Sequence, residues 1–214
     1  MKNEEKKVQN LFDDIANPYS DAVKRTNYIG PEWLLENLEG EDIKTDHIRI
    51  LDLGCANGIN IANLHRLNPT LLATGVDISP KMIETAKATE LYKALYCQSL
   101  DVGLTFCKAK NYDMIIALGC LEFVNNIDFC LSEISRVCTR GGYFYATFQH
   151  FEEKNRYAPR QTRSGDVIHF AYSTTEVLTK LSESNLHVLS LKEMIGYTGG
   201  FPCPYIFVVA QKQQ

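Results

Sequence analysis

The first forty residues carry the apolar spacing of helices. Apolar side chains recur at three- and four-residue intervals, at Val8, Leu11, Phe12 and Ile15. This interval predicts an amphipathic helix, which ends at Asn17-Pro18 because proline disfavours the helical conformation of the residue before it. A second helix is expected over residues 20–38, with Pro31 in a turn or at a helix start inside it and Gly40 at its end.

From residue 47 the pattern changes to short apolar runs that alternate with helical segments. Strands are expected in five such runs, at residues 47–53, 71–76, 94–97, 112–118 and 143–148. Helices are expected between them, at residues 58–68, from Ser79-Pro80 onward, and from Ile127 to the Gly141-Gly142 turn. Strands and helices that alternate in this way build βαβ units, so a parallel sheet with helices on both faces is predicted.

The last forty residues depart from this alternation. Ser173 and Glu176 form the capping-box pattern at the start of a helix. Two strand-like runs follow, at residues 186–194 and 204–211. The nine residues between them are too few for a helical crossover, so these two strands are expected to pair antiparallel.

The composition narrows the class of protein. The chain of 214 residues suits one domain, and its 22 basic and 26 acidic residues give a net charge of −4. No basic stretch is interleaved with aromatic residues, which disfavours nucleic acid as the main partner. The seven cysteines include no CxxC pair, so we expect a reducing compartment, no disulfide framework and no zinc site. The polar N-terminal segment lacks the features of a signal peptide and no apolar run approaches the ~20 residues of a membrane helix, so a cytoplasmic protein is predicted.

The candidate chemistry begins at residues 50–58, which read Ile-Leu-Asp-Leu-Gly-Cys-Ala-Asn-Gly. The expected strand ends there in a sharp turn, and Gly54 and Gly58 let the backbone approach a ligand closely. Asp77 ends the second strand, 19 residues after Gly58. A carboxylate at that position accepts hydrogen bonds from both hydroxyls of a ribose, so the two segments together predict a nucleoside site.

This turn resembles motif I of the class I S-adenosylmethionine-dependent methyltransferases, which usually reads acidic-x-Gly-x-Gly-x-Gly. The match lies at Asp52, Gly54 and Gly58. Ala56 departs from it, because the family usually has a glycine there, and leaves the backbone slightly less room beside a ligand. Residues 74–83, Thr-Gly-Val-Asp-Ile-Ser-Pro-Lys-Met-Ile, are similar to the family's segment around the ribose-binding acid.

Further segments extend the resemblance to about half of the chain. Residues 96–101 resemble the segment that hydrogen-bonds adenine, and residues 112–124 resemble the fourth strand and the loop after it. In that loop Leu121-Glu122-Phe123-Val124 stands where the family commonly has Leu-Glu-His-Val, and residues 136–148 resemble the Gly-Gly turn and fifth strand. The sequence of these segments is most similar to that of the small-molecule methyltransferases of the ubiquinone and biotin pathways. Many of those begin with Phe-Asp-x-x-Ala-x-x-Tyr, a helix that closes over the cofactor, and residues 12–19 match it.

The resemblance implies an α/β, Rossmann-like fold. We expect a mostly parallel seven-stranded sheet with an antiparallel C-terminal strand hairpin and helices on both faces. A single domain would span the chain, divided into an N-terminal helical lid (1–40), a cofactor-binding core (48–148), an acceptor-side loop segment (149–172), and a C-terminal helix and strand hairpin (173–214).

The resemblance also implies S-adenosylmethionine as the cofactor and S-adenosylhomocysteine as the product. The implied cofactor contacts are Tyr19, Asp52, Gly54, Cys55, Ala56, Gly58, Asp77, Ile78, Met82, Ser99, Leu100, Asp101, Ala117, Leu118 and Gly119. Among them Asp77 would hold the ribose, Ile78 would cover the adenine, and Ser99 or Asp101 would contact the adenine amine. An acceptor pocket is expected at Leu121, Glu122, Phe123, Phe148 and Tyr157. His150, which follows the fifth strand, is either a general base or an unreactive residue of the sheet edge.

Other motifs argue against neighbouring chemistries. Asn17-Pro18-Tyr19 is similar to the Asn-Pro-Pro-Tyr of base-amine methyltransferases, but no strand precedes it, so DNA adenine methylation is rejected. Catechol-type enzymes hold magnesium with acids after the fourth strand, and the first acid there is Glu122, so no metal is expected. Four basic residues after the fifth strand either bind an anionic acceptor or belong to a solvated loop: Lys154, Arg156, Arg160 and Arg163.

Three functions follow from these patterns. The first is in-line transfer of a methyl group to oxygen, nitrogen or carbon of a small molecule, in which the enzyme chiefly aligns the acceptor behind the S–CH₃ bond. The second is a nicotinamide-dependent oxidoreductase, whose Gly-x-Gly-x-x-Gly fingerprint has Ala56 and Ile59 at its last two glycine positions here. The third is a catalytically inactive cofactor-binding fold that serves as an interaction module.

Overall fold

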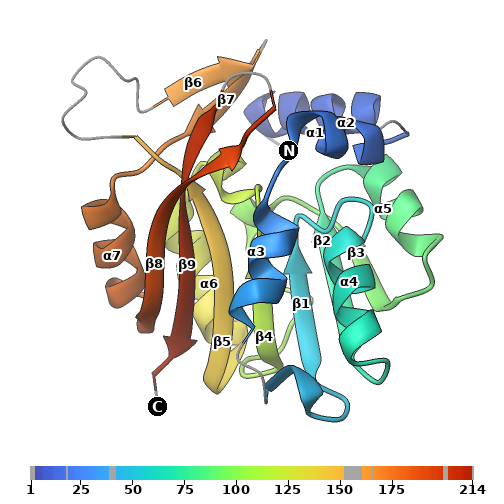
Figure 1. Cartoon of the computed structure of the whole chain (residues 1–214), viewed down its shortest axis with the longest axis vertical. Coiled ribbons are helices and arrows are strands. Elements are labelled where there is room, and N and C mark those ends of the chain that lie inside the picture. Colours follow the sequence, from blue (N-terminus) through green and yellow to red (C-terminus); the bar gives the residue numbers. More distant parts are fainter. Residues whose placement is uncertain are drawn as a thin grey trace.

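A twisted seven-stranded sheet forms the centre of the molecule. The computed structural model describes residues 3–17, 19–38, 42–151, 161–164, 166–199 and 202–213. The strands of the sheet lie in the order β3-β2-β1-β4-β5-β9-β8 (Figure 1). Their bounds are β1 Arg49–Leu53, β2 Leu72–Asp77, β3 Tyr92–Cys97, β4 Tyr112–Ala117, β5 Cys138–Gln149, β8 Leu186–Tyr197 and β9 Cys203–Lys212. Strands β1 to β5 pair parallel, and β9 pairs antiparallel with both β5 and β8, so the predicted fold class is confirmed.

Helices cover the two faces of this sheet. They are α1 Asn3–Ile15, α2 Tyr19–Thr26, α3 Gly30–Asn37, α4 Ile59–Leu67, α5 Pro80–Lys87, α6 Ile127–Val137 and α7 Thr174–Glu183, with short 3-10 turns η1 Asp42–Lys44, η2 Leu100–Val102 and η3 Leu121–Phe123. Local signals begin several of them as the sequence predicts. Ser79 caps α5 by accepting a hydrogen bond from the Met82 amide, and Ser173 and Glu176 form the capping box of α7.

Alternate residues of the strands pack into two apolar layers, because successive side chains of a strand point to opposite faces. Leu51 and Leu53 of β1 belong to the layer formed with α6 and α7. Ile50 belongs to the other layer, which α3 and α4 complete through residues such as Trp33 and Leu64. Both faces of the sheet are therefore buried, which explains the near-continuous apolar runs in the parallel strands.

The carboxyl ends of β1 to β4 meet at one edge of the sheet. Figure 1 shows α1 and α2 lying across the end of the molecule to which β1 points. A second, two-stranded sheet lies at the same end, made of β6 Gln161–Ser164 and β7 Val167–Phe170. The sequence analysis expected this part of the segment 149–172 to be a loop, and the short strands lacked the apolar alternation that would have marked them.

The structure differs from the sequence predictions in two further elements. The helix expected over 20–38 is two helices, because Asn27 adopts a left-handed conformation (φ 46°) and Tyr28 pairs with Tyr197 of β8 instead of continuing the helix. The helix from Ile127 ends at Val137 rather than at the Gly141-Gly142 turn. Its last residue leads directly into β5, which is longer than expected because β9 pairs along it.

Within the described residues, none of the helices combines the length and the apolar character that spanning a membrane requires.

Candidate cofactor and acceptor site

The loops at the carboxyl edge of the sheet enclose a pocket of about 610 Å³, a volume that includes the open space at its mouth. Its walls come from α1, from the turn after β1, and from the ends of β2, β3 and β4. The lining residues are Val8, Phe12, Tyr19, Gly54, Ala56, Val76, Asp77, Ile78, Gln98, Ser99, Leu100, Asp101, Leu118, Gly119, Cys120, Phe123 and Val124. Of these side chains only Asp77 and Asp101 are charged groups, so the described lining is acidic.

The turn after β1 requires glycine at position 54. Gly54 has φ +66°, and a Cβ built on it would lie 2.6 Å from the Cβ of Cys120. Two backbone hydrogen bonds stabilise the turn. Gly58 N donates to the Cys55 carbonyl (2.8 Å) within it, and Cys55 N donates to the Val76 carbonyl (3.0 Å) of β2. Ala56 also lies in the left-handed region (φ 44°), which an alanine adopts at some cost.

Asp77 fastens this turn to the end of β2. Its Oδ2 accepts a hydrogen bond from Ala56 N (2.9 Å), and its Oδ1 accepts one from Ser79 N (2.9 Å). The side chain lines the pocket although the residue is only 8% exposed. Burial raises the pKa of this carboxyl to about 6, against the backbone hydrogen bonds from Ser79 and Ala56 that lower it.

Asp52 lies beneath the same turn, fully buried and outside the pocket lining. Its Oδ2 accepts a hydrogen bond from the Tyr92 hydroxyl of β3 (2.7 Å), and its Oδ1 accepts one from Asn60 Nδ2 (3.4 Å). Burial raises its pKa to about 6, opposed by these two hydrogen bonds. Asp52 therefore braces the start of α4 against β3 and adds negative potential below the pocket.

The loop after β3 supplies the next wall. The Ser99 hydroxyl accepts a hydrogen bond from Asp101 N (3.1 Å) and donates to Glu5 of α1 (3.2 Å). The Asp101 carboxylate accepts hydrogen bonds from Asn126 N (2.8 Å) and from Asn125 Nδ2 (2.7 Å). This acid thus ties the loop after β3 to the loop after β4.

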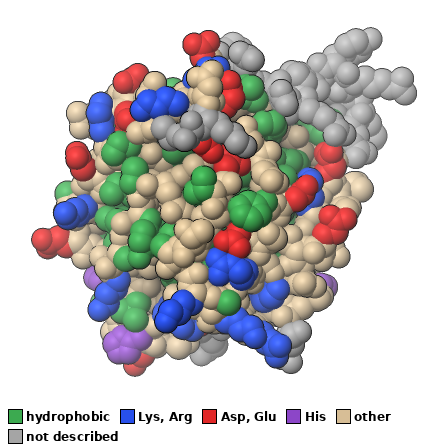
Figure 2. Space-filling view, turned by 180° about the vertical axis from the view of Figure 1, so that it is seen from behind, with side chains coloured by type: hydrophobic (Ala, Val, Ile, Leu, Met, Phe, Trp, Pro, Cys, Tyr) green, Lys and Arg blue, Asp and Glu red, His purple; other side chains and the backbone are tan. Residues whose placement is uncertain are grey.

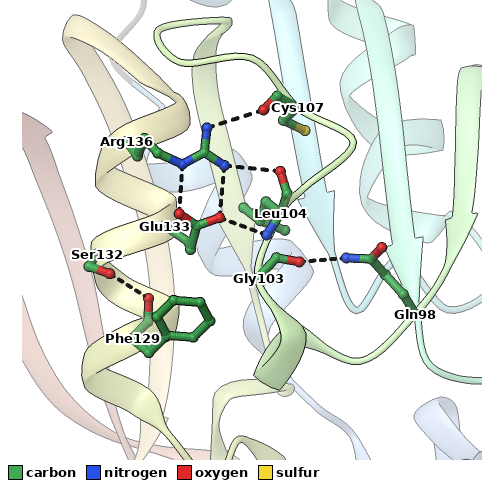
Figure 3. Close-up of polar contacts among 8 residues, drawn as sticks. All are labelled: Gln98, Gly103, Leu104, Cys107, Phe129, Ser132, Glu133 and Arg136. Carbon is green, nitrogen blue, oxygen red and sulfur yellow. Dashed lines mark hydrogen bonds and ion pairs between the residues drawn. The ribbon is translucent and has the colours of Figure 1, made fainter. Parts of the chain in front are cut away.

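A polar cluster on α6 holds the remainder of that loop in place (Figure 3). The Arg136 guanidinium donates to the Glu133 carboxylate at 2.6 and 2.7 Å and to the carbonyls of Leu104 (3.0 Å) and Cys107 (3.1 Å). Glu133 accepts a further hydrogen bond from Leu104 N (2.9 Å). The Gln98 side chain, which lines the pocket, donates to the Gly103 carbonyl (2.6 Å) in the same loop.

Helix α1 forms one wall of the pocket. Val8 and Phe12 line it, and the Phe12 ring meets Phe123 edge to face at 5.3 Å. Asp13 accepts a hydrogen bond from the Ser79 hydroxyl (2.5 Å), next to Asp77. The apolar stripe of α1 therefore lies where the sequence analysis expected a lid.

A buried acid follows the loop after β4. Glu122 is 1% exposed, and its Oε1 accepts a hydrogen bond from the Tyr205 hydroxyl of β9 (2.7 Å). Burial raises the pKa of Glu122 to about 7, and the hydrogen bond from Tyr205 opposes that rise. Its Oε2 is buried and has no hydrogen-bond partner among the described residues.

The structure brings most of the residues expected from the sequence to one pocket, but not all. Those that line it are Tyr19, Gly54, Ala56, Asp77, Ile78, Ser99, Leu100, Asp101, Leu118, Gly119 and Phe123. Those that do not are Asp52, Cys55, Gly58, Met82, Ala117, Leu121, Glu122, Phe148 and His150. Tyr157, Lys154, Arg156 and Arg160 lie outside the described residues, as does the side chain of Arg163.

The candidate general base His150 is turned away from this pocket. Its Nδ1 lies 3.1 Å from the Tyr172 carbonyl oxygen, and its Nε2 lies 3.7 Å from the carboxylate of Glu193 on β8. Of the two alternatives that the sequence left open, the described contacts favour a residue that joins the sheet edge to the segment before α7.

Several lining residues were missed at the level of sequence. Val76 is the next-to-last residue of β2, Gln98 follows β3, and Cys120 and Val124 lie in the loop after β4. Position next to a strand end was the available signal for each of them. Val8 and Phe12 were expected in the lid, but only the packing of α1 shows that they face the pocket.

On the face drawn in Figure 2, the described charged side chains do not form a continuous basic surface. Figure 2 shows the side opposite to that of Figure 1, where acidic and basic side chains are interspersed and the basic ones gather toward the lower end. The pocket lies at the other end of the sheet, under α1.

A doubly covered parallel sheet, a glycine turn after β1 and an acid at the end of β2 define the class of nucleoside-binding α/β proteins. Within it, residues 51–146 match the methyltransferase domain family, and over these residues the resemblance to the class I S-adenosylmethionine-dependent methyltransferases is confirmed. The cofactor of this family is S-adenosylmethionine, as the sequence resemblance implied.

Known proteins with different acceptors are similar to the chain. It is 28% identical over 109 residues to the ubiquinone biosynthesis O-methyltransferase of Pelagibacter ubique, a match that covers 50% of this chain and 45% of that protein. It is also 28% identical over 116 residues to the 18S rRNA guanine-N7-methyltransferase of Saccharomyces cerevisiae, covering 54% of this chain and 41% of that protein. The matches thus span less than half the length of these relatives.

A solved structure shares the fold over nearly the whole chain. It comes from a complex between the Haloferax volcanii Trm112 methyltransferase activator and a candidate methyltransferase. The TM-score is 0.77 with 16% sequence identity, covering 97% of this chain and 98% of that one. At this identity the likeness concerns the fold alone.

The described residues fit a sulfonium nucleoside. Asp77 lines the pocket at the end of β2, and each of its carboxylate oxygens accepts one backbone hydrogen bond and retains a lone pair that could accept a ribose hydroxyl. The described lining holds acids and contains neither lysine nor arginine, which suits a cofactor with a positively charged sulfur.

Proposed function

We propose that this protein transfers a methyl group from S-adenosylmethionine to a small, partly apolar acceptor. The observation that carries the proposal is the acidic pocket whose walls include Asp77 and the Gly54 turn, closed by α1. When bound, the cofactor supplies a methyl group already activated by its attachment to a sulfonium. The protein then needs to hold this group, orient the acceptor and exclude water.

In this proposal, different parts of the pocket wall bind different parts of the cofactor. Asp77 binds the ribose hydroxyls, Ile78 and Leu100 cover the adenine, and Ser99 or Asp101 meets its amine. The turn from Gly54 to Ala56, with Asp52 beneath it and Tyr19 opposite, receives the amino acid end. These assignments follow the sequence hypothesis except for Asp52. This residue is buried beneath the turn and is not part of the pocket lining, so it acts on the cofactor without direct contact.

The acceptor enters over the loop that follows β4. That loop contributes Gly119, Cys120 and Phe123 to the pocket, and Glu122 is buried behind it. A small acceptor agrees with the enclosure by α1 and with the interspersed surface charges in Figure 2, which offer no basic track for a phosphate backbone on that face. Glu122 replaces His150 as our candidate for taking a proton from the acceptor, since it lies at that loop.

The nicotinamide alternative is weakened by the hydrogen bonds of the glycine turn. A pyrophosphate is held by free amides at such a turn and at the following helix N-terminus. Here the amide of Ala56 donates to Asp77, and those of Cys55 and Gly58 donate to backbone carbonyls. We also propose a cytoplasmic location, because all seven cysteines are free thiols.

The test is transfer of a labelled methyl group from S-adenosylmethionine. Protein incubated with separated metabolite, RNA and protein fractions of a cell extract should label the metabolite fraction, and an Asp77→Ala variant should not. Labelling of RNA alone would overturn the small-molecule acceptor. Binding of NADH and none of S-adenosylhomocysteine would overturn the methyltransferase activity itself.

A further inference from the structure

Three tyrosines gather immediately beyond the loop after β4. Tyr28 lies between α2 and α3, Tyr197 at the end of β8, and Tyr205 in β9. The rings of Tyr28 and Tyr197 stack at 4.5 Å, and Tyr205 lies 5.5 Å from Tyr197 and 6.1 Å from Tyr28. Burial raises the pKa of all three hydroxyls well above the usual range, so the tyrosines are neutral at physiological pH. We call these three residues the tyrosine cluster.

Glu122 lies at this cluster with an unused oxygen. The Tyr205 hydroxyl binds its Oε1, whereas its Oε2 is buried without a hydrogen-bond partner among the described residues. Gln149 of β5, paired with Tyr205 in the sheet, is 8% exposed and has a buried Oε1 that also finds no partner there. Cys203 lies near both, because its Sγ accepts a hydrogen bond from Gln149 (3.5 Å), and burial together with the charge of Glu122 raises the pKa of its thiol.

The unsatisfied groups are therefore both acceptors. Buried polar atoms without partners are uncommon in folded proteins, and each costs free energy until a partner arrives. Two unpaired acceptor oxygens on residues that both neighbour Tyr205 call for a ligand that brings N–H or O–H donors. A carboxylate and three electron-rich rings also attract positive charge.

The tyrosine cluster adjoins the cofactor pocket through Gly119. Gly119 lines that pocket, and its amide donates to the Thr147 hydroxyl (2.8 Å), which is hydrogen-bonded to the Tyr28 hydroxyl (2.9 Å). A Cβ built on Gly119 would lie 3.4 Å from the Tyr197 hydroxyl and 3.4 Å from the Tyr28 ring. A ligand held by the cluster would thus have one end beside the cofactor site.

We propose that Glu122 and the tyrosine cluster bind an amine, and that its nitrogen is the methyl acceptor. This inference rests on the proposed function and names the substrate class of the same site. Glu122 Oε2 and Gln149 Oε1 accept hydrogen bonds from N–H or O–H groups of the ligand, and the tyrosine rings border its positive charge.

The charge balance of the reaction agrees with this environment. The Glu122 carboxylate first takes one proton from the bound ammonium and passes it to solvent, which leaves a lone pair on nitrogen. That lone pair forms the N–C bond while the C–S bond breaks, and the electron pair of the broken bond stays on sulfur. The positive charge thereby passes from sulfur to nitrogen, and the methylated product leaves as an ammonium. A carboxylate and tyrosine rings stabilise the cation that forms, whereas they would repel a carboxylic acid acceptor.

Binding of a cation and of its neutral isostere by the protein saturated with S-adenosylhomocysteine tests the proposal. The probes are choline and dimethylbutanol, the alcohol in which carbon replaces the ammonium nitrogen. By calorimetry, choline should bind at least about tenfold more tightly than dimethylbutanol, as expected for a partly desolvated cation beside aromatic rings and a carboxylate. Equal affinity, or no binding of choline, would overturn the amine assignment.

Matched variants separate recognition of charge from a general loss of structure. Tyr197→Leu and Glu122→Gln should each weaken choline about fivefold or more, whereas Tyr197→Phe, which keeps the aromatic face, should retain most of the affinity. Glu193→Gln on the exposed part of β8 is the control for the charge change. All variants should keep their affinity for S-adenosylhomocysteine, and weakening of choline by Glu193→Gln to the same extent would contradict the assignment.

Turnover provides the second readout. With S-adenosylmethionine, dimethylethanolamine should be methylated in preference to a phenol or a carboxylic acid of similar size. Preferential methylation of the phenol would overturn the amine inference and leave the proposed function standing. Failure of the protein to bind S-adenosylhomocysteine would instead overturn the proposed function, so the two failures are distinguishable.

Discussion

Among single residues, Asp77 should set the pH dependence of cofactor binding. Its pKa is about 6 without ligand, and the ionised carboxylate accepts hydrogen bonds from ribose hydroxyls more strongly than the protonated acid does, so binding should release a proton below that pH. The affinity for S-adenosylhomocysteine should therefore increase as the pH rises from about 5 to about 7. Calorimetry in buffers of different ionisation enthalpy measures both the affinity and the proton released.

Replacement of Asp77 by asparagine should weaken the same ligand at least about tenfold, because a charged hydrogen-bond acceptor contributes ~1.5–3 kcal/mol. The pH dependence should also become flatter. Asp128→Asn, an exposed acid on α6, is the control and should bind as the wild type does. Wild-type affinity in Asp77→Asn would reject the ribose assignment.

Gly54 and Gly141 form a matched pair of single residues for a second comparison. Gly54 and Gly141 both have positive φ, +66° and +76°, but a Cβ on Gly54 would lie 2.6 Å from the Cβ of Cys120, while one on Gly141 meets nothing within 4 Å. Both alanine variants should lose ~1–2 kcal/mol of stability to backbone strain. Only Gly54→Ala should also lose binding of S-adenosylhomocysteine, measured by calorimetry on the folded variants. Normal binding by Gly54→Ala would show that the turn does not face the ligand.

Among the elements, α1 is the part most able to respond to a ligand. It is joined to the core by a few contacts at the pocket, among them Asp13 with Ser79 and Phe12 with Phe123. Elements that cover binding sites are often drawn from the less stable parts of a fold. Amide hydrogen exchange in α1 should become slower when S-adenosylhomocysteine is added, as mass spectrometry of its peptides would show.

Substitutions at the neighbouring acids Asp13 and Asp14 test which contact holds α1 in place. Asp13→Asn should accelerate exchange in α1 without ligand and weaken the ligand a few-fold, because a neutral amide oxygen accepts the Ser79 hydrogen bond less strongly than the carboxylate does. Asp14→Asn, one position along and exposed, should change neither. If exchange in α1 is already slow and insensitive to ligand, the helix is a fixed part of the core and not a lid.

The loop after β3 depends on α6 in a comparable way. Arg136→Met removes four hydrogen bonds from Arg136 to this cluster (Figure 3), and should lower the free energy of unfolding by about 1–2 kcal/mol, since the site is partly exposed. Urea denaturation measures that loss. Affinity for S-adenosylhomocysteine should fall a few-fold, because Gln98 and Ser99 lie in the same loop. Arg140→Met, exposed at the start of β5, should have neither effect.

For the whole molecule, the buried acids determine how stability varies with pH. Asp52 and Asp77 have pKa values of about 6 and Glu122 one of about 7, all above their ordinary values of 3.8 and 4.5. Between about pH 4.5 and pH 7 the folded state therefore binds more protons than the unfolded state, so stability should fall as the pH rises. Asp113 and Glu133, whose pKa values are lowered by Arg49 and Arg136, act in the opposite sense at lower pH.

The melting temperature of the ligand-free protein should accordingly decrease from about pH 5 to about pH 7.5. Glu122→Gln should remove the part of this decrease that lies near pH 7, because it leaves no carboxyl to ionise there. A melting temperature that rises through this range in the wild type would contradict the raised pKa values.

At every scale, the features that the sequence alone determined are those that depend on interactions between residues close together in the chain. Short apolar runs and helical periods predicted the order of most strands and helices, because burial of both faces of a strand, or of one face of a helix, imposes these patterns. Gly54, Asp77 and the capping residues Ser79 and Ser173 were recognisable because each acts through its own backbone neighbourhood or a short spacing in the chain. The resemblance built on these motifs identified the family and its cofactor, which the comparisons confirmed.

The tertiary structure alone decided which side chains share one site, because contacts between distant segments leave no periodic mark in the sequence. It carried Asp52 beneath the turn, directed His150 toward Tyr172 and Glu193, and brought Val8 of α1 to the pocket. It also assembled the tyrosine cluster from Tyr28 and from Tyr197 and Tyr205, which most of the chain separates from Tyr28. Glu122 was visible from the start as a motif position, but only its burial against Tyr205, with one oxygen left unpaired, gave it a chemistry.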